Sequence, residues 1–405
     1  MEFRLLFASS AVQKCTILRS EIRGEFPVRL LQSIVHYSIH HLAFPLNEGR
    51  QLFYAMQTLL LQVFVCFLLA SIASGRYFKE VPRLSRLCGK QHCILISKEY
   101  HSSKLEQTWV DNAHRWSDDF CSHMDAFTKE THEWLATISA LNHNKSSSAI
   151  DENIFSSFVS SYDCNGKIVQ KRTWIEPLSH GLRHPRALCD GGADLVDRDY
   201  LLLDSHDEFR SPATKRHELC GGCVGRSCQN IYVDLGASTW NTGGGGPSQS
   251  WFYDSYKRHG IEFDRLLLWE ANPTPAAAIF SDLPKDVWHK YQYFNWPASS
   301  NSSDASSPLH IIKKIAKPGD FVVLKLDIDT PSVELPILRD LLNDPELLDL
   351  VDEFFFEYHV LFGPMNPAWF GSENPNPRPT TETLADSYAV FRTLREKGVR
   401  AHSWV

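Results

Sequence analysis

The chain has 405 residues, of which 43% are hydrophobic and 22% are charged, and its formal net charge is -7. This balance excludes a disordered tail, a collagen-like fibre and a multi-span membrane protein. The slightly negative charge offers no basic surface for a phosphate backbone, so nucleic acid is not expected as a partner. At roughly 100–200 residues per domain, the length allows about two or three domains.

One apolar segment lies near the N-terminus, from Leu52 to Ser74, and contains no charged residue. About 20 such residues can cross a bilayer as a single transmembrane helix. If translation starts at Met56, the segment reads instead as a signal sequence, with Ser71-Ile-Ala73 as its small-x-small cleavage pattern. A buried core helix is the third interpretation. Residues 1–51 form a leader to which the sequence assigns no role.

The first two interpretations place the rest of the chain in the secretory pathway, either as a single-pass membrane protein of the endoplasmic reticulum or Golgi or as a secreted protein. Basic residues between Arg76 and Lys90 favour a cytosolic C-terminal side by the positive-inside tendency. Two other features favour the lumen: all cysteines except Cys15 and Cys66 follow the segment, which suits disulfides, and glycosylation sequons begin at Asn144 and Asn301. The luminal placement is preferred.

The region 75–229 is predicted to be helical and irregular and to contain most of the cysteines. Ser103 and Glu106 have capping-box spacing, and apolar residues that recur from Trp109 to Ile138 predict one long amphipathic helix. Tyr200–Asp204 is expected to be a short strand. Cys220, Cys223 and Cys228, with His217 or Cys189, could begin a zinc site, but disulfides are preferred and no residue is assigned to a metal.

The pattern changes at Asn230, where strands and helices begin to alternate. Strands are predicted over 231–235, 265–270, 291–294, 321–327, 353–357 and 399–404, and helices over 248–258, 275–281, 310–316, 332–342 and 383–397. This alternation predicts an α/β fold with a mostly parallel sheet whose faces are covered by helices.

Residues suited to ligand binding close several of these predicted strands, at the edge where open α/β sheets bind ligands. They are Asp234 and Gly236 at the first strand, Glu270 at the second, Asp327 and Asp329 at the fourth, and Glu357 and His359 at the fifth. A Gly243–Gly246 run follows the first strand. The chain has no Gly-Lys-Ser/Thr after this run, which excludes a P-loop, and no strict G-x-G-x-x-G fingerprint.

Four segments in this part of the chain resemble the FkbM-like family of S-adenosylmethionine-dependent methyltransferases, over roughly residues 230–405. They are Val233–Ser238, Leu268–Pro273, Leu324–Asp329 with Glu334, and Phe355–His359. The resemblance implies a Rossmann-like methyltransferase fold that binds S-adenosylmethionine. Two departures stand out, because Ser238 replaces the family's Asn, and Ile328-Asp329-Thr330 replaces its Val-Glu-Gly.

By this resemblance, the turn with Asp234, Gly236 and Ser238 surrounds the methionine moiety together with Gly243 and Gly244. Glu270 would hold the ribose, Asp329 would also contribute to cofactor binding, and Asp327 would face the methyl group and the acceptor.

The predicted reaction is methyl transfer to a hydroxyl or carboxyl group of a small molecule or glycan. The candidates for a catalytic base are Asp327 and His359, since the ordinary pKa of histidine suits proton removal near neutral pH. Two alternatives stay open. Asp327-Ile-Asp329 is also the D-x-D pattern of a metal-dependent luminal glycosyltransferase. The domain could also have kept the fold without the chemistry.

Overall fold

The computed structural model describes residues 93–116, 120–127, 129–130, 133–134, 136–137, 150–164, 167–179, 198–202, 229–241, 248–365 and 380–404. All of them belong to one compact unit, Cys88–Val405. The apolar segment Leu52–Ser74, the sequon at Asn144 and the cysteines from Cys189 to Cys228 lie outside these residues. Within the described ranges, no helix is both long and apolar enough to cross a membrane. The secretory placement therefore stays a prediction. The disulfide pairing also stays a prediction, although Cys121 is disulfide-bonded.

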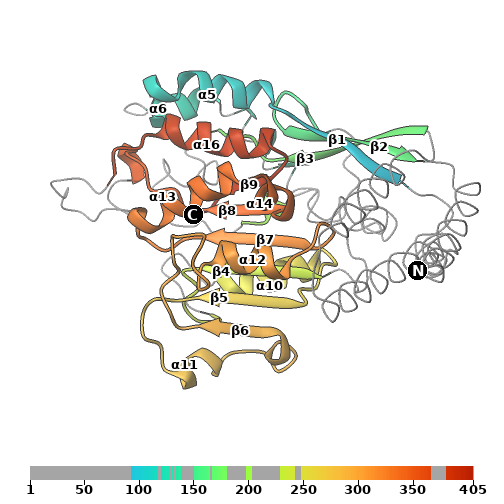
Figure 1. The fold of residues 1–405 in the computed structure, drawn as a ribbon. Helices are drawn as coiled ribbons and strands as arrows, with labels where there is room; N and C mark the ends of the chain where they lie inside the picture. Colours follow the sequence, from blue (N-terminus) through green and yellow to red (C-terminus); the bar gives the residue numbers. More distant parts are fainter. Residues whose placement is uncertain are drawn as a thin grey trace, which may run out of the picture. The chain divides into compact units, whose positions relative to one another are not determined.

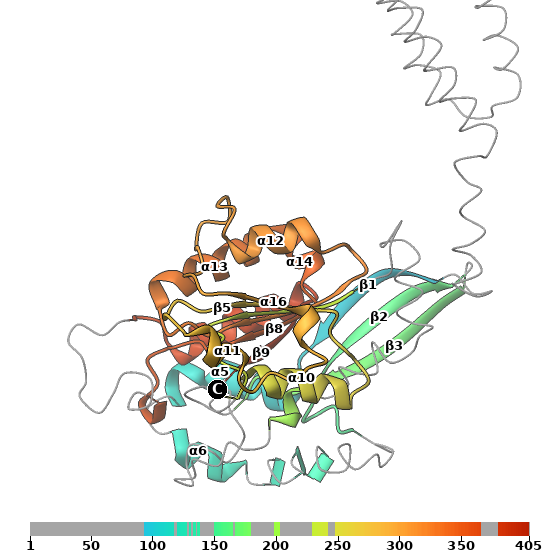
Figure 2. The same cartoon turned by 90° about the horizontal axis from the view of Figure 1, so that it is seen from below.

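The centre of the unit is a six-stranded, all-parallel sheet with helices on both faces (Figures 1 and 2), so the predicted α/β class is confirmed. Its strands, in spatial order, are β6 (Tyr291–Phe294), β5 (Arg265–Trp269), β4 (Asn230–Leu235), β7 (Phe321–Leu326), β8 (Glu353–Phe356) and β9 (Arg400–Ser403). All six were predicted to within two residues at each end. The prediction succeeded because strands covered on both faces are continuous apolar runs, as in Phe321–Leu326, every residue of which is buried.

The helices connect these parallel strands. They are α10 (Ser248–Arg258), α11 (Ala276–Phe280), α12 (Pro308–Ile315), α13 (Pro331–Asn343), α14 (Pro345–Leu350) and α16 (Leu384–Glu396). Figure 2 shows α12, α13 and α14 on one face of the sheet and α10 on the opposite face. This division follows from right-handed crossovers, because the chain moves outward from β4 in one direction and later from β7 in the other.

The strand order reverses between β4 and β7. Numbered along the chain within this sheet, the spatial order is 3-2-1-4-5-6, which is the order of the doubly wound dinucleotide-binding fold. The sheet is therefore compatible with a Rossmann-like fold. In such sheets the point of reversal is where ligands bind, beyond the carboxyl ends of the strands.

A smaller antiparallel sheet precedes this part of the chain and contains β1 (Cys93–His101), β2 (Ser156–Cys164) and β3 (Lys167–Ile175). It is followed along the chain by a short 3-10 helix, Asp199–Leu202. The prediction of a strand over Tyr200–Asp204 is therefore wrong. Leu201 and Leu202 are buried as the sequence suggests, but a three-residue apolar run has too few positions to separate strand from helical periodicity.

The helix predicted after Ser103 is present, but its described residues belong to separate helices, α5 (Lys104–Trp116) and α6 (Phe120–Ala126), and residues 129–130, 133–134 and 136–137 are also helical. The prediction of one long helix is wrong, although the apolar spacing is used as expected. The ring centroid of Trp109 lies 5.3 Å from that of Phe120 and 5.4 Å from that of Phe127. Contacts between two successive helices keep the same three- and four-residue periodicity, so the sequence pattern did not reveal the break.

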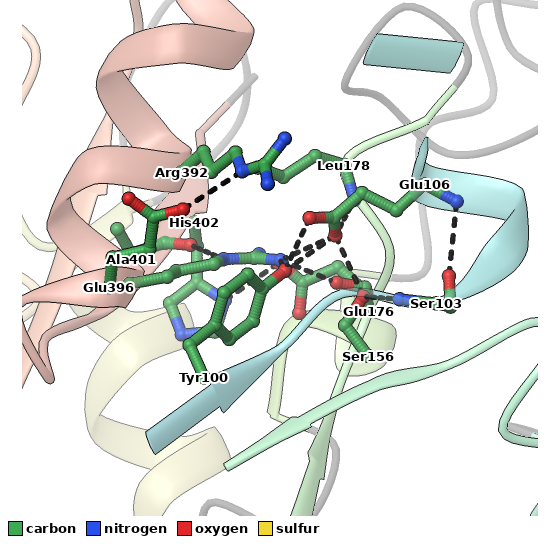
Figure 3. A network of polar contacts seen from close by, with 11 residues as sticks. Tyr100, Ser103, Glu106, Ser156, Glu176, Leu178, Arg392, Glu396, Ala401 and His402 are labelled. Carbon is green, nitrogen blue, oxygen red and sulfur yellow. Dashed lines mark hydrogen bonds and ion pairs between the residues drawn. The ribbon is translucent and has the colours of Figure 1, made fainter. Parts of the chain in front are cut away.

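The predicted N-cap is also present, but the Glu106 side chain has a different role. The Glu106 amide donates to Ser103 Oγ at 3.0 Å. The Glu106 carboxylate does not complete the reciprocal capping box, and it accepts hydrogen bonds from Tyr100, Ser156 and the Leu178 amide instead. Figure 3 shows these groups converging on the fully buried carboxylate.

The same buried network joins the N-terminal segments to α16 and β9. Arg395, on α16, donates to the Glu176 carboxylate at 2.5 Å and to the Glu176 carbonyl at 2.8 Å, and its Nη1 lies 3.5 Å from Glu106 Oε2. His402 Nδ1, on β9, lies 3.0 Å from Glu176 Oε1. Arg395 and His402 are fully buried, so this network holds charge inside the protein core.

Candidate functional site

The carboxyl edge of the central sheet is level across four neighbouring strands. Leu235 of β4 is in register with Trp269 of β5 and Leu326 of β7, and Leu326 is in register with Phe356 of β8. The next residues along the chain are therefore side by side at this edge, and they are Gly236, Glu270, Asp327 and Glu357. The parallel register thus brings together residues far apart in the sequence, as expected from the strand-end pattern.

Gly236 forms the tight contact between the loops after β4 and β7. Its φ angle is +86°, and a Cβ at this position would lie 1.6 Å from the carbonyl oxygen of Asp327. The Asp327 amide in turn donates to the Leu235 carbonyl at 2.9 Å. Glycine is required here by the neighbouring backbone, and the left-handed φ is a second reason for it.

Glu270 holds the turn that follows Gly236. Its Oε2 accepts a hydrogen bond from the Ser238 amide at 2.9 Å, and its Oε1 accepts one from the Asn272 amide at 2.8 Å. Ser238 has a φ of +53°, and its carbonyl accepts the Tyr293 hydroxyl at 2.7 Å. Since a carboxylate has about four acceptor positions, Glu270 keeps acceptor capacity for a ligand.

Asp234 lies behind this edge and is fully buried. Its Oδ1 is 3.1 Å from the Lys325 ammonium, and its Oδ2 accepts the Tyr232 hydroxyl at 2.7 Å. Burial raises the pKa of Asp234, and Lys325 opposes this shift. The described contacts give Asp234 a structural position under the turn, not one that faces a ligand.

Asp327 is held in place by neighbouring side chains. Its Oδ2 lies 2.8 Å from Lys325 Nζ and accepts the Trp404 indole N–H at 3.1 Å. Burial alone would raise the pKa of Asp327, but the Lys325 ammonium, a hydrogen bond with Glu357 and the charge of His359 together outweigh burial, and the pKa is lowered. An ionised carboxylate paired in this way is a weak base, so the structure favours Asp327 less than the sequence did for that role.

Asp329, Glu357 and His359 converge beside Asp327. His359 Nε2 lies 3.5 Å from Asp329 Oδ1 and 3.4 Å from Glu357 Oε2. The His359 side chain is 7% exposed, the Glu357 side chain 17% and the Asp329 side chain 78%, so the group opens to solvent on the Asp329 side. Asp329 has a φ of +58°, a strained conformation of the kind that is concentrated at functional sites.

Carboxyl groups outnumber cationic groups in this part of the edge, and burial is the first cause of the shifts in their pKa values. Burial raises the pKa of Glu357, and burial also raises that of Glu334, to about 7. Burial would lower the pKa of His359, but Glu357, Glu334 and Asp329 together outweigh burial, and the pKa is raised. Glu334, on α13, uses Oε1 to accept the Ile328 amide at 2.9 Å. These groups face one another across the loops after β7 and β8.

Two residues of this site were not named as site residues from the sequence. Lys325 could have been found, because it is the one charged residue within the apolar run Phe321–Leu326. A buried lysine requires a carboxylate partner, which points to Asp234 and Asp327. Trp404 had no comparable signal, because its contact with Asp327 joins residues 77 positions apart.

Other predicted site residues cannot be placed. Gly243 and Gly244 lie outside the described residues, as do the possible zinc ligands from Cys189 to Cys228. The predicted residues that the structure brings together are Gly236, Ser238, Glu270, Asp327, Asp329 and His359. No protein-family model, curated protein or solved structure matches the chain.

Proposed function

We propose that residues 230–405 form a Rossmann-like methyltransferase domain that transfers a methyl group from S-adenosylmethionine to a hydroxyl or carboxyl of a small molecule or glycan. One observation carries the proposal. The turn after β4, the carboxylate after β5 and the Asp327-Ile-Asp329 segment after β7 meet where the strand order reverses, and the Ser238 amide donates to Glu270 there at 2.9 Å. This edge is where a doubly wound sheet binds a nucleotide-type cofactor.

The chemistry of the edge supports a cofactor of this class. S-adenosylmethionine carries a ribose with two hydroxyl donors and a positively charged sulfonium. Glu270 has acceptor capacity for the hydroxyls, and the excess of carboxylates around Asp327 and Asp329 favours a positive charge nearby. Methyl transfer then requires chiefly that the donor and acceptor are held in line.

The acceptor would lie on the open side of the edge, near Asp329. Of the two candidates for proton removal, His359 is the better supported, because the Asp327 carboxylate is paired with Lys325 and Trp404. Those contacts also count against Asp327 as a metal ligand of a D-x-D glycosyltransferase, since its Oδ2 is already shared by two donors.

Calorimetric titration of the full-length chain with S-adenosylmethionine tests the proposal. Binding is expected, and Glu270→Gln should weaken it by about tenfold or more, because a charge-assisted hydrogen bond is lost. The matched control is Glu396→Gln, an exposed glutamate at the end of α16 that pairs with Arg392. Control and variant should have the same circular dichroism spectrum as the unaltered protein.

The outcomes separate the three functional hypotheses. Binding that is lost only in Glu270→Gln supports the methyltransferase. Absence of binding by the folded, unaltered chain would overturn it, and titration with a sugar nucleotide would follow. If that titration also gave no heat, a domain without this chemistry would be the better explanation.

A further inference from the structure

The geometry points to a divalent-cation site formed by Asp329, Glu357 and His359 at the carboxyl ends of β7 and β8. One oxygen from each carboxylate and one imidazole nitrogen lie within 4.8 Å of one another. The sequence placed these residues after two different strands and gave no reason to treat them as one ligand set. The role of the ion in methyl transfer rests on the function proposed above, but its binding does not.

The separations fit a metal polyhedron better than a salt bridge. Charge-assisted N–H···O contacts are about 2.7–2.9 Å long, whereas His359 Nε2 is 3.5 Å from Asp329 Oδ1 and 3.4 Å from Glu357 Oε2. Ligands at about 2.1–2.2 Å from a divalent ion are roughly 3.0–3.5 Å apart, from octahedral to tetrahedral geometry. The two contacts to His359 therefore have the length of polyhedron edges, and the exposed Asp329 side chain is free of packing that would prevent the small rotation needed to close the third edge.

The surrounding charges favour a cation at this place. Asp234, Asp327, Asp329, Glu334 and Glu357 gather around Lys325 and His359. The Lys325 ammonium lies between Asp234 and Asp327, at 3.1 and 2.8 Å. A divalent ion between Asp329, Glu357 and His359 would offset the remaining negative charge where burial makes it most unfavourable.

The environment of the group resembles a reactive metal site more than a structural one. Glu357 and His359 form a largely buried wall, and Asp329 lies at its exposed rim. Three protein ligands leave at least one coordination position open, as in catalytic sites. If the proposed function holds, an acceptor hydroxyl can occupy that position, and the ion would lower its pKa so that the proton passes to solvent at the exposed side, since His359 Nε2 would be occupied by the ion.

The ligand types define the class of ion. One imidazole with two carboxylates suits a first-row divalent cation such as Mn²⁺, because carboxylates favour hard ions and imidazole favours borderline ones. Mn²⁺ is also the better probe here. The cysteines outside the described residues would bind Zn²⁺ through thiolates, whereas Mn²⁺ has little preference for sulfur.

The test is a titration of the full-length chain with MnCl₂, followed by the electron paramagnetic resonance signal of free Mn²⁺. One tightly bound ion per chain is expected. Asp329→Asn, Glu357→Gln and His359→Gln should each weaken binding by about tenfold or more. The controls are Asp349→Asn and His289→Gln, which alter exposed residues on α14 and on the 3-10 helix Trp288–Lys290 and should leave binding unchanged.

A second readout identifies the histidine directly. Bound Mn²⁺ should show coupling to an imidazole nitrogen in spin-echo spectra, and this coupling should disappear in His359→Gln. The proposal is overturned if the chain binds no Mn²⁺, or if the ligand variants and controls bind it equally. Asp329 is exposed, so its variant reports on the site even if either buried substitution impairs folding.

This experiment is independent of the titration with S-adenosylmethionine. Cofactor binding without Mn²⁺ binding would reject the cation site and leave the methyltransferase proposal standing. Mn²⁺ binding that needs His359, without cofactor binding, would support the cation site and reject the methyltransferase.

Discussion

This protein has two clusters of charged side chains, one suited to hold the fold together and the other suited to bind a ligand. The buried network contains Tyr100, Glu106, Glu176, Arg395 and His402. There, the contacts to the Glu176 side chain are 2.5 and 3.0 Å, and the charged groups are shielded from solvent. At the carboxyl edge, the contacts of His359 are 3.4 and 3.5 Å, and the Asp329 side chain is 78% exposed.

The difference shows what each cluster is suited to do. In the network, buried cations and carboxylates are matched, and the groups come from β1, α5, the segment after β3, α16 and β9, so the network fixes these elements to one another. At the edge, carboxylates outnumber cations and the contacts of His359 are long. Such an arrangement contributes little stability and favours the binding of a positively charged ligand.

The largest expected effect is on the buried network. Arg395→Met should lower the free energy of unfolding by about 3–5 kcal/mol, because it leaves Glu106 and Glu176 buried without their cation. Urea unfolding of the full-length chain measures the change. The control is Arg392→Met, one turn earlier on α16, which removes only an exposed pair with Glu396 and should cost about 0.5 kcal/mol or less. Equal losses in the two variants would contradict the structural role of the network.

A smaller loss of stability is expected from substitution of Gly236, which packs against the backbone of Asp327 at the carboxyl edge. Gly236→Ala should be destabilising by about 2–4 kcal/mol, from the left-handed φ and from collision with the Asp327 carbonyl. Gly260→Ala is a matched control, because its φ is +78° and a Cβ there meets no atom within 4 Å. It should cost about 1–2 kcal/mol. The difference between the two, measured by urea unfolding, isolates the contact between the loops after β4 and β7.

The pH dependence of stability provides a third comparison. Burial would raise the pKa of Glu176, but His402 and Arg395 together outweigh it, and the pKa is lowered from its ordinary value of 4.5. The folded state therefore binds the Glu176 proton less tightly than the unfolded state. The stabilisation is fully present above about pH 4.5 and is lost as the pH falls below that value toward the folded pKa.

Glu176→Gln removes this titration. Between about pH 6 and pH 3.5, the stability of the unaltered protein should fall more steeply than that of the variant, as measured by urea unfolding at each pH. Parallel curves would show that Glu176 has the same pKa in the folded and unfolded states.

The smallest expected effect, and one of opposite sign, is at the carboxyl edge. Asp329→Asn should leave the stability unchanged or raise it by up to about 1 kcal/mol, because it removes one charge from a group rich in carboxylates. Asparagine also tolerates the φ of +58°. Thermal unfolding without added metal checks this. A clear loss of stability would mean that Asp329 belongs to the structural part of the protein.

The elements that could be predicted from the sequence are those that depend on residues close together in the chain. The strands of the central sheet were predicted closely, because each is a short apolar run between polar loops. The helix α14 was not predicted, and one helix was expected where α5 and α6 occur. Local periodicity identifies which face is apolar, but it does not reveal where tertiary packing interrupts the helix.

The candidate site also has features that the sequence determined and features that it did not. The sequence by itself determined the parallel sheet and the edge at which Gly236, Glu270, Asp327 and Glu357 emerge, because strand ends in a parallel sheet share one edge and their residue types can be read directly. Only the tertiary structure decided which partner each charge has. It buried Asp234 against Lys325, paired Asp327 with Trp404 and brought Asp329 to His359. The physical reason is that the energy of a charge depends on its burial and its distance to other charges, and residues far apart in the sequence set both.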